Sequence, residues 1–141
     1  FKPMPMLRKW LDTQGQLGMD TRLCRFGYGR LRFLNDLRHS DKKAADRAAR
    51  NTPIQGTSAL MMKEALILMD ELSLQRPGEV YLIGSIHDEA LSELSEAALE
   101  ELKAESQARM LRAADIFLSD EQGNILVKGD VGMGIGPTWT K

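Results

Sequence analysis

Residues 79–94 decide the fold, and their sequence is EVYLIGSIHDEALSEL. Val80, Leu82 and Ile83 favour a strand over residues 79–86, because such apolar side chains fit a pleated, half-buried surface. His87 and Asp88 then form a tight turn, and residues 89–94 return as a second strand. The pattern predicts a β-hairpin that carries the Asp88 carboxylate at its tip, pointing outward.

Helical patterns flank this hairpin on both sides. Residues 53–74 are apolar around nearly the whole helix, which is typical of a buried central helix, and Pro77 and Gly78 end them. Residues 96–114 form another helix, residues 125–131 a last strand and residues 132–139 a glycine-rich tail. We therefore predict an α+β fold in which an antiparallel sheet, with the hairpin at its centre, packs on two or three long helices.

The residues before this region predict a smaller group of elements. A helix over residues 4–17 should end at Gly15 and Gly18, and a hairpin follows at 22–34 around two further glycines. A polar loop, 35–41, leads to a short basic helix, 42–50. Thr52 is a good N-cap and Pro53 suits a first helical turn, so a new helix should begin there.

Length and charge suggest one domain, 1–141, with two unlike parts. Residues 1–50 hold 12 Lys and Arg against 5 Asp and Glu, a net charge of +7, whereas residues 51–141 hold 7 against 15, a net of −8. The basic part, which contains the first helix, hairpin and short helix, would suit phosphates, and the acidic part would suit cations. The alternative is that both are ordinary solvated charge.

Composition excludes several classes of protein. The apolar runs are too short for a membrane span, and residues 1–9 lack the apolar region of a secretory signal. Cys24 is the only cysteine, which excludes a disulfide framework and a thiolate metal cage. We expect a reducing, cytoplasmic setting, and the start at Phe1 suggests a processed or excised piece.

Asp88 and Glu89 are the first candidate site. Two adjacent carboxylates after an apolar strand suit a hard divalent cation, which prefers oxygen ligands and keeps several waters. His87 precedes them. The alternative is a plain turn, because Asp is common in turns and a histidine there can simply be hydrogen-bonded.

Arg47, Asn51 and Gln55 are the second candidate site, because they recur every four residues. With a break at Thr52 and Pro53, they should line two helix ends that meet. Side chains of these types bind phosphates, sugars and base edges, and Gly56 would let a bulky ligand approach the backbone. The alternative is a solvent-exposed polar seam beside the central helix.

The hairpin at 22–34 is the third. Its arginines, which include Arg30, alternate with aromatic residues in a pattern that suits a nucleic-acid backbone. The alternative is a positively charged edge strand that discourages aggregation.

Four motifs in this order resemble the C-terminal part of the polymerase domain of family A DNA polymerases, over essentially all 141 residues. They are Gly29-Arg30-Leu-Arg, Arg47-Ala-Ala-x-Asn51-x-Pro53-x-Gln55-Gly-Thr57, Ile86-His-Asp-Glu89, and Val131-Gly-x-Gly134 with a late Trp139.

The resemblance implies a role for each candidate residue. Asp88 is similar to the carboxylate of the third polymerase motif, a ligand of catalytic Mg²⁺, with Glu89 as its acidic neighbour and His87 against the primer terminus. The same resemblance implies that four residues of the basic part contact the primer–template: Arg30, Arg47, Asn51 and Gln55. The implied reaction adds deoxynucleotides to a primer 3′-hydroxyl by two-metal phosphoryl transfer.

Two family elements are missing from this sequence, namely the first-motif aspartate and the fingers helix that binds deoxynucleoside triphosphates. We therefore expect this palm portion to need the N-terminal remainder of the polymerase, in a bacterial or phage-infected cell, and to be inactive alone. One alternative is a non-catalytic nucleic-acid-binding module on a palm scaffold. Another is a fragment of a single-subunit RNA polymerase.

Overall fold

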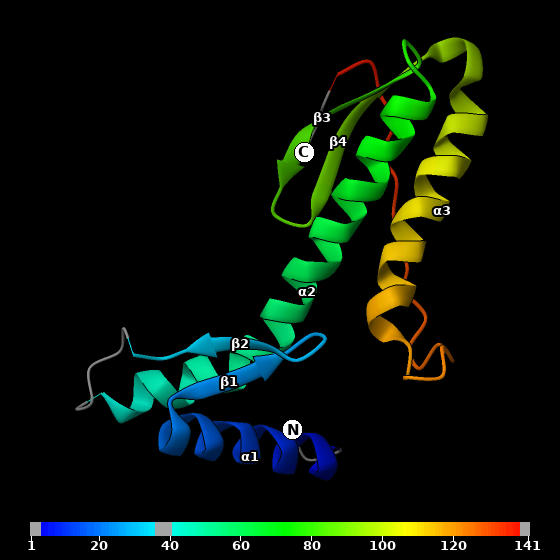
Figure 1. Cartoon of the computed structure of the whole chain (residues 1–141). Helices are drawn as coiled ribbons and strands as arrows, with labels where there is room; N and C mark the ends of the chain where they lie inside the picture. Colours follow the sequence, from blue (N-terminus) through cyan, green and yellow to red (C-terminus); the bar gives the residue numbers. More distant parts are fainter. Residues whose placement is uncertain (1–3, 36–40, 139–141) are drawn as a thin grey trace. The chain divides into compact units, whose positions relative to one another are not determined.

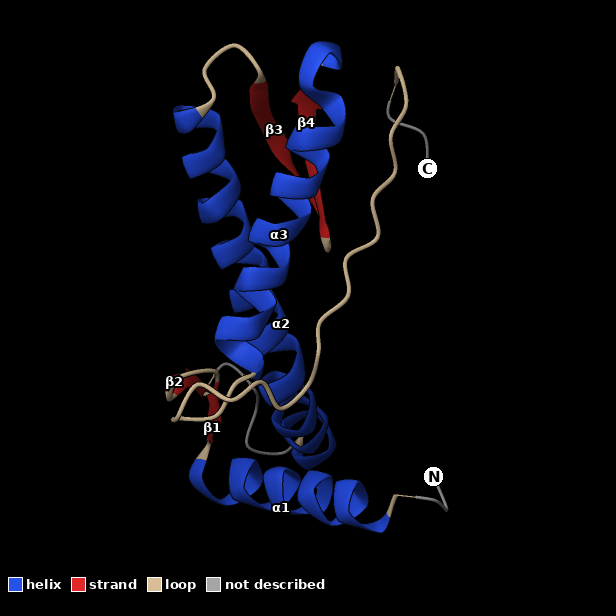
Figure 2. Ribbon diagram, turned by 90° about the vertical axis from the view of Figure 1, so that its right-hand side faces the viewer, coloured by secondary structure: helices blue, strands red, loops and turns tan. Residues whose placement is uncertain are grey.

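The structure, a computed structural model, describes residues 4–35 and 41–138. In these residues it contains three α-helices, a short 3₁₀ helix and two separate two-stranded antiparallel sheets (Figures 1 and 2). The predicted α+β class is confirmed. The chain divides into two compact units, Phe1–Leu60 and Met61–Lys141, so the division falls later than the change of charge at residue 50.

The long helix α2 runs from Lys42 to Gln75 without a break, with Pro53 in its interior. The predicted new start at Thr52 and Pro53 is therefore wrong. A proline inside a helix removes one backbone hydrogen bond and costs about 3 kcal/mol. The packing of the helix residues before and after Pro53 must offset this cost. Thr52 is buried there, and its hydroxyl donates to the Ala48 carbonyl at 2.7 Å.

Helix α1, Pro5–Thr21, continues through both glycines that were expected to end it. Gly15 and Gly18 are buried, and a Cβ on Gly18 would overlap the methyl group of Ala49 in α2. A glycine inside a helix costs about 1 kcal/mol, but here it allows close packing of α1 on α2. The helix ends at Arg22, whose left-handed backbone lets its N–H donate to the Gly18 carbonyl.

Strands β1, Leu23–Phe26, and β2, Arg30–Phe33, form the predicted basic hairpin. Phe26 pairs with Arg30, so residues 27–29 make the turn, and Tyr28 and Gly29 both adopt positive φ. Cys24 and Leu34 pack with Ala49 of α2 in the core of the first unit. The predicted loop at 35–41 falls mostly outside the described residues.

Strands β3, Val80–Ile86, and β4, Glu89–Leu94, form the predicted hairpin, with a register irregularity between Leu82 and Gly84; in the described residues they make a two-stranded sheet of their own and not the centre of a larger one. Helix α3, Leu99–Leu118, follows the 3₁₀ helix η1, Glu96–Ala98. The hairpin packs on α2 and α3 as expected. The largest core cluster of the described residues joins all three elements through Met69, Leu72, Val80 and Leu102.

The central helix is not buried all round, contrary to the expectation. Ala65, Leu68 and Leu72 are buried, whereas Ile54 and Ile67 are more than half exposed. Apolar character in the sequence therefore overstates how much of α2 is covered by the described residues.

The predicted last strand, 125–131, does not form. Ile125 makes an isolated bridge with Ser119, and residues 126–138 adopt neither helix nor strand. Instead this segment follows α3 (Figure 2), where the Gln107 side chain donates to the Val131 carbonyl at 2.9 Å. A strand needs a partner, and the described residues place no third strand beside β3 and β4. Trp139 lies outside the described residues.

In the described part of the chain, no helix has the length and apolar character needed to cross a membrane.

Candidate functional site

The turn between β3 and β4 carries the first candidate site. Ile86 pairs with Glu89, so His87 and Asp88 are the only two residues of the turn, and all three candidate residues, 87–89, are exposed. His87 has φ of 57°, a left-handed conformation that histidine adopts more readily than most residues. The Asp88 carboxylate is therefore held at the tip of a packed hairpin, as predicted.

Two carboxylates at this tip fit part of a magnesium site. Mg²⁺ in proteins is usually held by one or two carboxylates, with waters and substrate phosphates completing its octahedral shell. Nowhere in residues 4–35 and 41–138 do three or more His, Cys, Asp or Glu side chains gather closely enough to hold a metal ion. A metal ion held by Asp88 and Glu89 would therefore need further oxygen ligands from beyond this set.

The second candidate site is a row of exposed side chains on α2. Arg47, Asn51 and Gln55 are all exposed, and because the helix is continuous, their spacing places them along one face. They do not line two helix ends, as the predicted break required. Lys43, also exposed, extends the row by one turn; it was not among the predicted contacts, although its four-residue spacing from Arg47 could have identified it.

Some arginines of the unit Phe1–Leu60 already have ion-pair partners, whereas others have none among the described residues. Arg50 pairs with Asp12 of α1 at 2.6 Å and with Asp46 at 2.9 Å, and its hydrogen bond holds the pKa of the Asp12 carboxyl below the usual value. Neither Arg30 nor Arg47 forms an ion pair with another described residue. Arg30 and Arg47, the two arginines predicted to contact DNA, are therefore among those whose charge no ion pair within the described residues neutralises.

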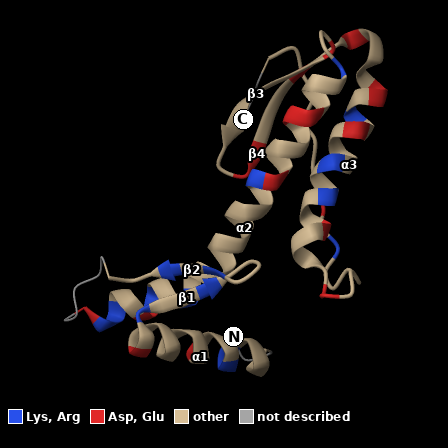
Figure 3. Cartoon of the chain, viewed as in Figure 1, with Lys and Arg blue, Asp and Glu red and all other residues tan. Residues whose placement is uncertain are grey.

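Arg30 begins β2, directly after the turn, and every residue of β2 is exposed. Figure 3 shows Lys and Arg gathered on β1, β2 and the first part of α2, all within the unit Phe1–Leu60. Arg32 is partly committed to the fold, because its guanidinium donates to the Thr52 hydroxyl at 3.2 Å. Arg30 makes no such bond to α2 among the described residues.

Gly56 has a different role from the one predicted. A Cβ on Gly56 would lie 2.5 Å from Cδ2 of Phe26, so the close approach that glycine permits is made by the hairpin's own aromatic ring and not by a ligand. The next residue, Thr57, accepts a hydrogen bond from the Gly27 N–H at 3.2 Å. Gly56 and Thr57 thus form the contact surface of α2 on which the β1–β2 hairpin packs.

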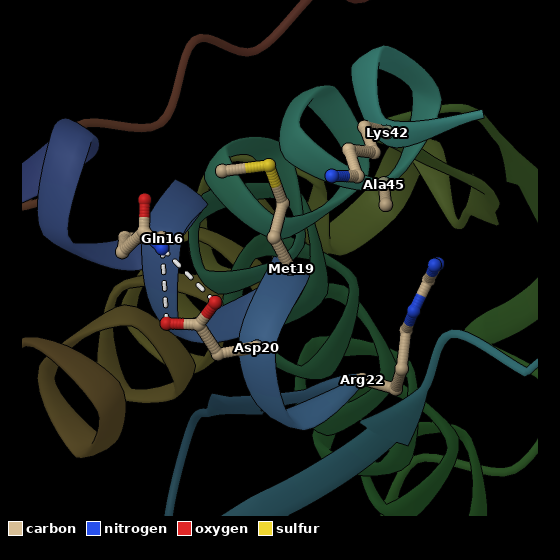
Figure 4. A pocket seen from close by; sticks show the side chains of 6 residues that line it. All are labelled: Gln16, Met19, Asp20, Arg22, Lys42 and Ala45. Carbon is tan, nitrogen blue, oxygen red and sulfur yellow. Dashed lines mark hydrogen bonds between the residues drawn. The ribbon is translucent and has the colours of Figure 1, made fainter. Parts of the chain in front are cut away.

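A cavity of about 330 Å³ lies at the C-terminal end of α1 (Figure 4); of the three candidate sites, only the basic hairpin reaches its lining, through Arg22. The Gln16 amide donates to both carboxylate oxygens of Asp20 at its wall, at 3.0 Å each. The Asp20 carboxylate lines the cavity together with the cationic Arg22 and Lys42, so it lowers the net positive charge of the lining. We assign it no role.

The residues predicted to contact DNA and the residues predicted to hold the metal ion belong to different units. Arg30, Arg47, Asn51 and Gln55 belong to Phe1–Leu60, whereas His87, Asp88 and Glu89 belong to Met61–Lys141.

Comparison with known proteins relates the whole chain to one family. The model of "DNA polymerase family A" matches residues 1–141. The chain is 31% identical over 141 residues to DNA polymerase I of Chloroflexus aurantiacus, covering 99% of this chain and 14% of that protein. It is 33% identical over 107 residues to the thermostable DNA polymerase I of Thermus filiformis, covering 74% and 13%.

A solved structure gives the same relationship. The POL domain of Pol1 from M. smegmatis, in complex with DNA primer-template and dNTP, superposes with a TM-score of 0.66 at 30% identity. The match covers 75% of this chain and 19% of that one, so the chain corresponds to a small part of its relatives. Together, the matched family model, the identities and the fold show that the chain belongs to DNA polymerase family A.

Proposed function

We propose that this chain is the C-terminal palm portion of a template-directed DNA polymerase, in which it supplies one catalytic carboxylate and part of the primer–template surface. The observation that carries the proposal is the exposed hairpin tip, with Asp88 in its two-residue turn and Glu89 directly after it, in a chain of this family. An exposed acidic tip on an apolar, packed hairpin is rigid enough to hold an ion at a defined place.

Asp88 and Glu89 would hold Mg²⁺ in the assembled enzyme. The chemistry supplied by the bound ion is charge neutralisation at the transferring phosphoryl group and activation of the primer 3′-hydroxyl. The protein's own contribution is to orient the Asp88 carboxylate through the Ile86–Glu89 pair and to present His87 beside it, against the primer terminus.

The row on α2 and Arg30 would bind the primer–template. Arg47 and Arg30 each bring a charge without an ion-pair partner among the described residues, which favours phosphate contacts. Asn51 and Gln55 offer hydrogen bonds from the same helix face, suited to sugars and minor-groove acceptors. A polymerase must accept every base pair, so we expect these contacts to be independent of sequence.

The chain would act together with the N-terminal remainder of the polymerase. It spans 14% of the length of the Chloroflexus relative, and its sequence contains neither the first-motif aspartate nor the fingers helix. The other ligands of the ion and the deoxynucleotide site would come from that remainder. The cofactor would be Mg²⁺, and the substrates primer–template DNA and deoxynucleoside triphosphates.

Reconstitution tests this proposal. This chain, mixed with the complementary N-terminal piece, should extend a primer in the presence of Mg²⁺, and neither piece should do so alone. Duplex binding without any extension would instead support the non-catalytic binding module, and extension by the isolated 141-residue chain would contradict the need for a partner.

A further inference from the structure

The β1–β2 hairpin packs on α2 through three contacts, which lie on two successive turns of the helix. The Arg32 guanidinium donates to the Thr52 hydroxyl, the Phe26 ring covers Gly56, and the Gly27 N–H donates to the Thr57 hydroxyl. All of them lie within the unit Phe1–Leu60. The hairpin is therefore fixed on the same stretch of helix that carries the exposed row with Asn51 and Gln55.

The Thr57 hydroxyl both donates and accepts a hydrogen bond in this arrangement. It donates to the Pro53 carbonyl at 2.6 Å and accepts from the Gly27 N–H at 3.2 Å. Because the hydroxyl proton is committed to Pro53, a lone pair is left to face Gly27, and the orientation of the bond is fixed. Without this hydroxyl, the Gly27 N–H would lose the acceptor that α2 provides.

Gly27 connects the Thr57 hydroxyl to the backbone of Arg30. Its carbonyl accepts a hydrogen bond from the Arg30 N–H at 3.2 Å, which closes the turn. A continuous chain of hydrogen bonds thus runs from the Pro53 carbonyl through the Thr57 hydroxyl and the Gly27 peptide unit to the Arg30 backbone. Tyr28 and Gly29, between the two ends of this turn, both have positive φ, so the loop has a defined conformation.

From this chain of bonds we propose that Thr57 is a positioning residue that holds Arg30 in a fixed relation to the exposed row on α2. The inference rests on the proposed function, in which Arg30 and that row bind one primer–template. An arginine on a fixed hairpin gives up little conformational freedom when it meets a phosphate, whereas one on a loose hairpin must be ordered on binding. Thr57 acts through Arg30 and does not touch DNA itself.

A double-mutant cycle in the assembled enzyme tests this role. Duplex affinity is measured against salt for the wild type, Thr57→Val, Thr57→Ser, Arg30→Ala and the Thr57→Val/Arg30→Ala double variant. We expect Thr57→Val to weaken binding about fivefold, the size of one lost hydrogen bond, and Thr57→Ser to restore it. In the Arg30→Ala background, Thr57→Val should change neither the affinity nor the salt slope.

Thr13→Val is the matched control. Its hydroxyl is exposed on α1 and donates only to the Lys9 carbonyl at 2.9 Å among the described residues, so the same substitution there should leave DNA affinity unchanged. Far-UV circular dichroism checks that each variant folds. If Thr57→Val fails that check, Thr57→Ala replaces it in the same cycle.

The outcomes separate the two proposals. If Arg30→Ala changes neither affinity nor salt slope, Arg30 has no part in DNA binding, and both the proposed DNA contact and the role of Thr57 fall. If Arg30→Ala weakens binding but Thr57→Val has no effect, or the two losses simply add, the positioning role is overturned and the proposed function stands.

Discussion

The two hairpins of this chain have similar architecture and opposite chemistry. Each consists of two antiparallel strands, each packs on α2, and each has a non-glycine residue with positive φ in its turn, Tyr28 in one and His87 in the other. The turn of β1–β2 leads into Arg30, whereas the turn of β3–β4 presents Asp88 and Glu89. One is suited to phosphate and the other to a cation.

The hairpins also differ in what holds them. The longer one, β3–β4, is anchored by apolar burial, with Val80 of β3 packed against Leu72 and Leu102. The shorter one, β1–β2, exposes all of β2 and depends on Phe26, two threonine hydroxyls and a small core around Cys24 and Leu34. The β3–β4 hairpin, which is proposed to hold the metal ion, is therefore stabilised mainly by apolar burial. The β1–β2 hairpin, which is proposed to contact DNA, is stabilised mainly by a few specific contacts.

The largest expected effect is at the acidic turn. In the assembled enzyme, Asp88→Ala should lower kcat about a hundredfold or more and leave DNA affinity nearly unchanged, because a direct ligand to a catalytic ion acts on transition-state charge. Glu89→Ala should cost less. Glu93→Ala is the control, since Glu93 is exposed on the same strand away from the tip. Retention of more than about a tenth of kcat by Asp88→Ala would show that the ligand assignment is wrong.

The apolar anchoring of β3–β4 gives the next largest effect. Leu102 is fully buried against this hairpin, so Leu102→Ala should destabilise the unit Met61–Lys141 by about 2–5 kcal/mol. Urea unfolding measures the loss, and amide exchange locates it in β3 and β4. Leu126→Ala, at an exposed position in the C-terminal segment of the same unit, is the control. Equal losses for the two variants would contradict the described core.

A smaller loss of stability is expected at Gly56, where the β1–β2 hairpin packs on α2. Gly56→Ala places a methyl group against the Phe26 ring, which should displace the hairpin at a cost of about 1–3 kcal/mol. Amide exchange should increase in β1 and β2 and stay unchanged in β3 and β4. Gly84→Ala is the matched control, because a Cβ there meets nothing within 4 Å. Unchanged exchange in β1 and β2 would mean that Phe26 does not rest on Gly56.

Local patterns predicted both hairpins, because strand alternation and turn residues act over a few positions. The sequence alone placed His87 and Asp88 in the turn and Glu89 at the start of the returning strand, and it showed the four-residue spacing of Arg47, Asn51 and Gln55. The roles of these residues in catalysis and DNA binding remain predictions.

Features that depend on tertiary contacts were not predictable in the same way. Thr52 and Pro53 have the local signature of a helix start, yet packing carries α2 through them. Gly18 has the signature of a helix end, yet it is the contact point with Ala49. Thr57 could not be identified as a hairpin anchor, because nothing in its neighbourhood along the chain indicates that Gly27, thirty residues earlier, would lie on it.

The row on α2 gives a test of the basic surface that is independent of the hairpin. Arg47→Ala should weaken duplex binding by a similar factor on unrelated sequences and reduce the salt slope by about one unit. Gln55→Ala should lower affinity with less change in slope, because glutamine neutralises no phosphate. Arg50→Ala, which removes an arginine already paired with Asp12 and Asp46, should change the slope least. A strong dependence on sequence for Arg47→Ala would favour the polar-seam alternative.

The smallest effect concerns acid stability, and here the two units should respond to different groups. The Arg50 hydrogen bond lowers the pKa of Asp12 in the first unit, and the Arg76 hydrogen bond lowers the pKa of Glu101 in the second. A carboxyl with a lowered pKa in the folded state stabilises that state above its unfolded pKa, and the contribution is lost as pH falls through the folded value. Both losses should therefore begin near pH 4 and grow below it.

Nuclear magnetic resonance titration of the two carboxyl groups measures these shifts directly. Arg50→Ala should return the pKa of Asp12 towards its ordinary value and leave that of Glu101 unchanged, whereas Arg76→Ala should do the reverse, because each ion pair is confined to one unit. Both carboxylates are exposed, so solvent screens the pairs and the melting temperature should change only slightly at neutral pH. A response of both carboxyls to either substitution would show that the two units are electrostatically coupled, and the contrast between them would then be weaker than the contacts indicate.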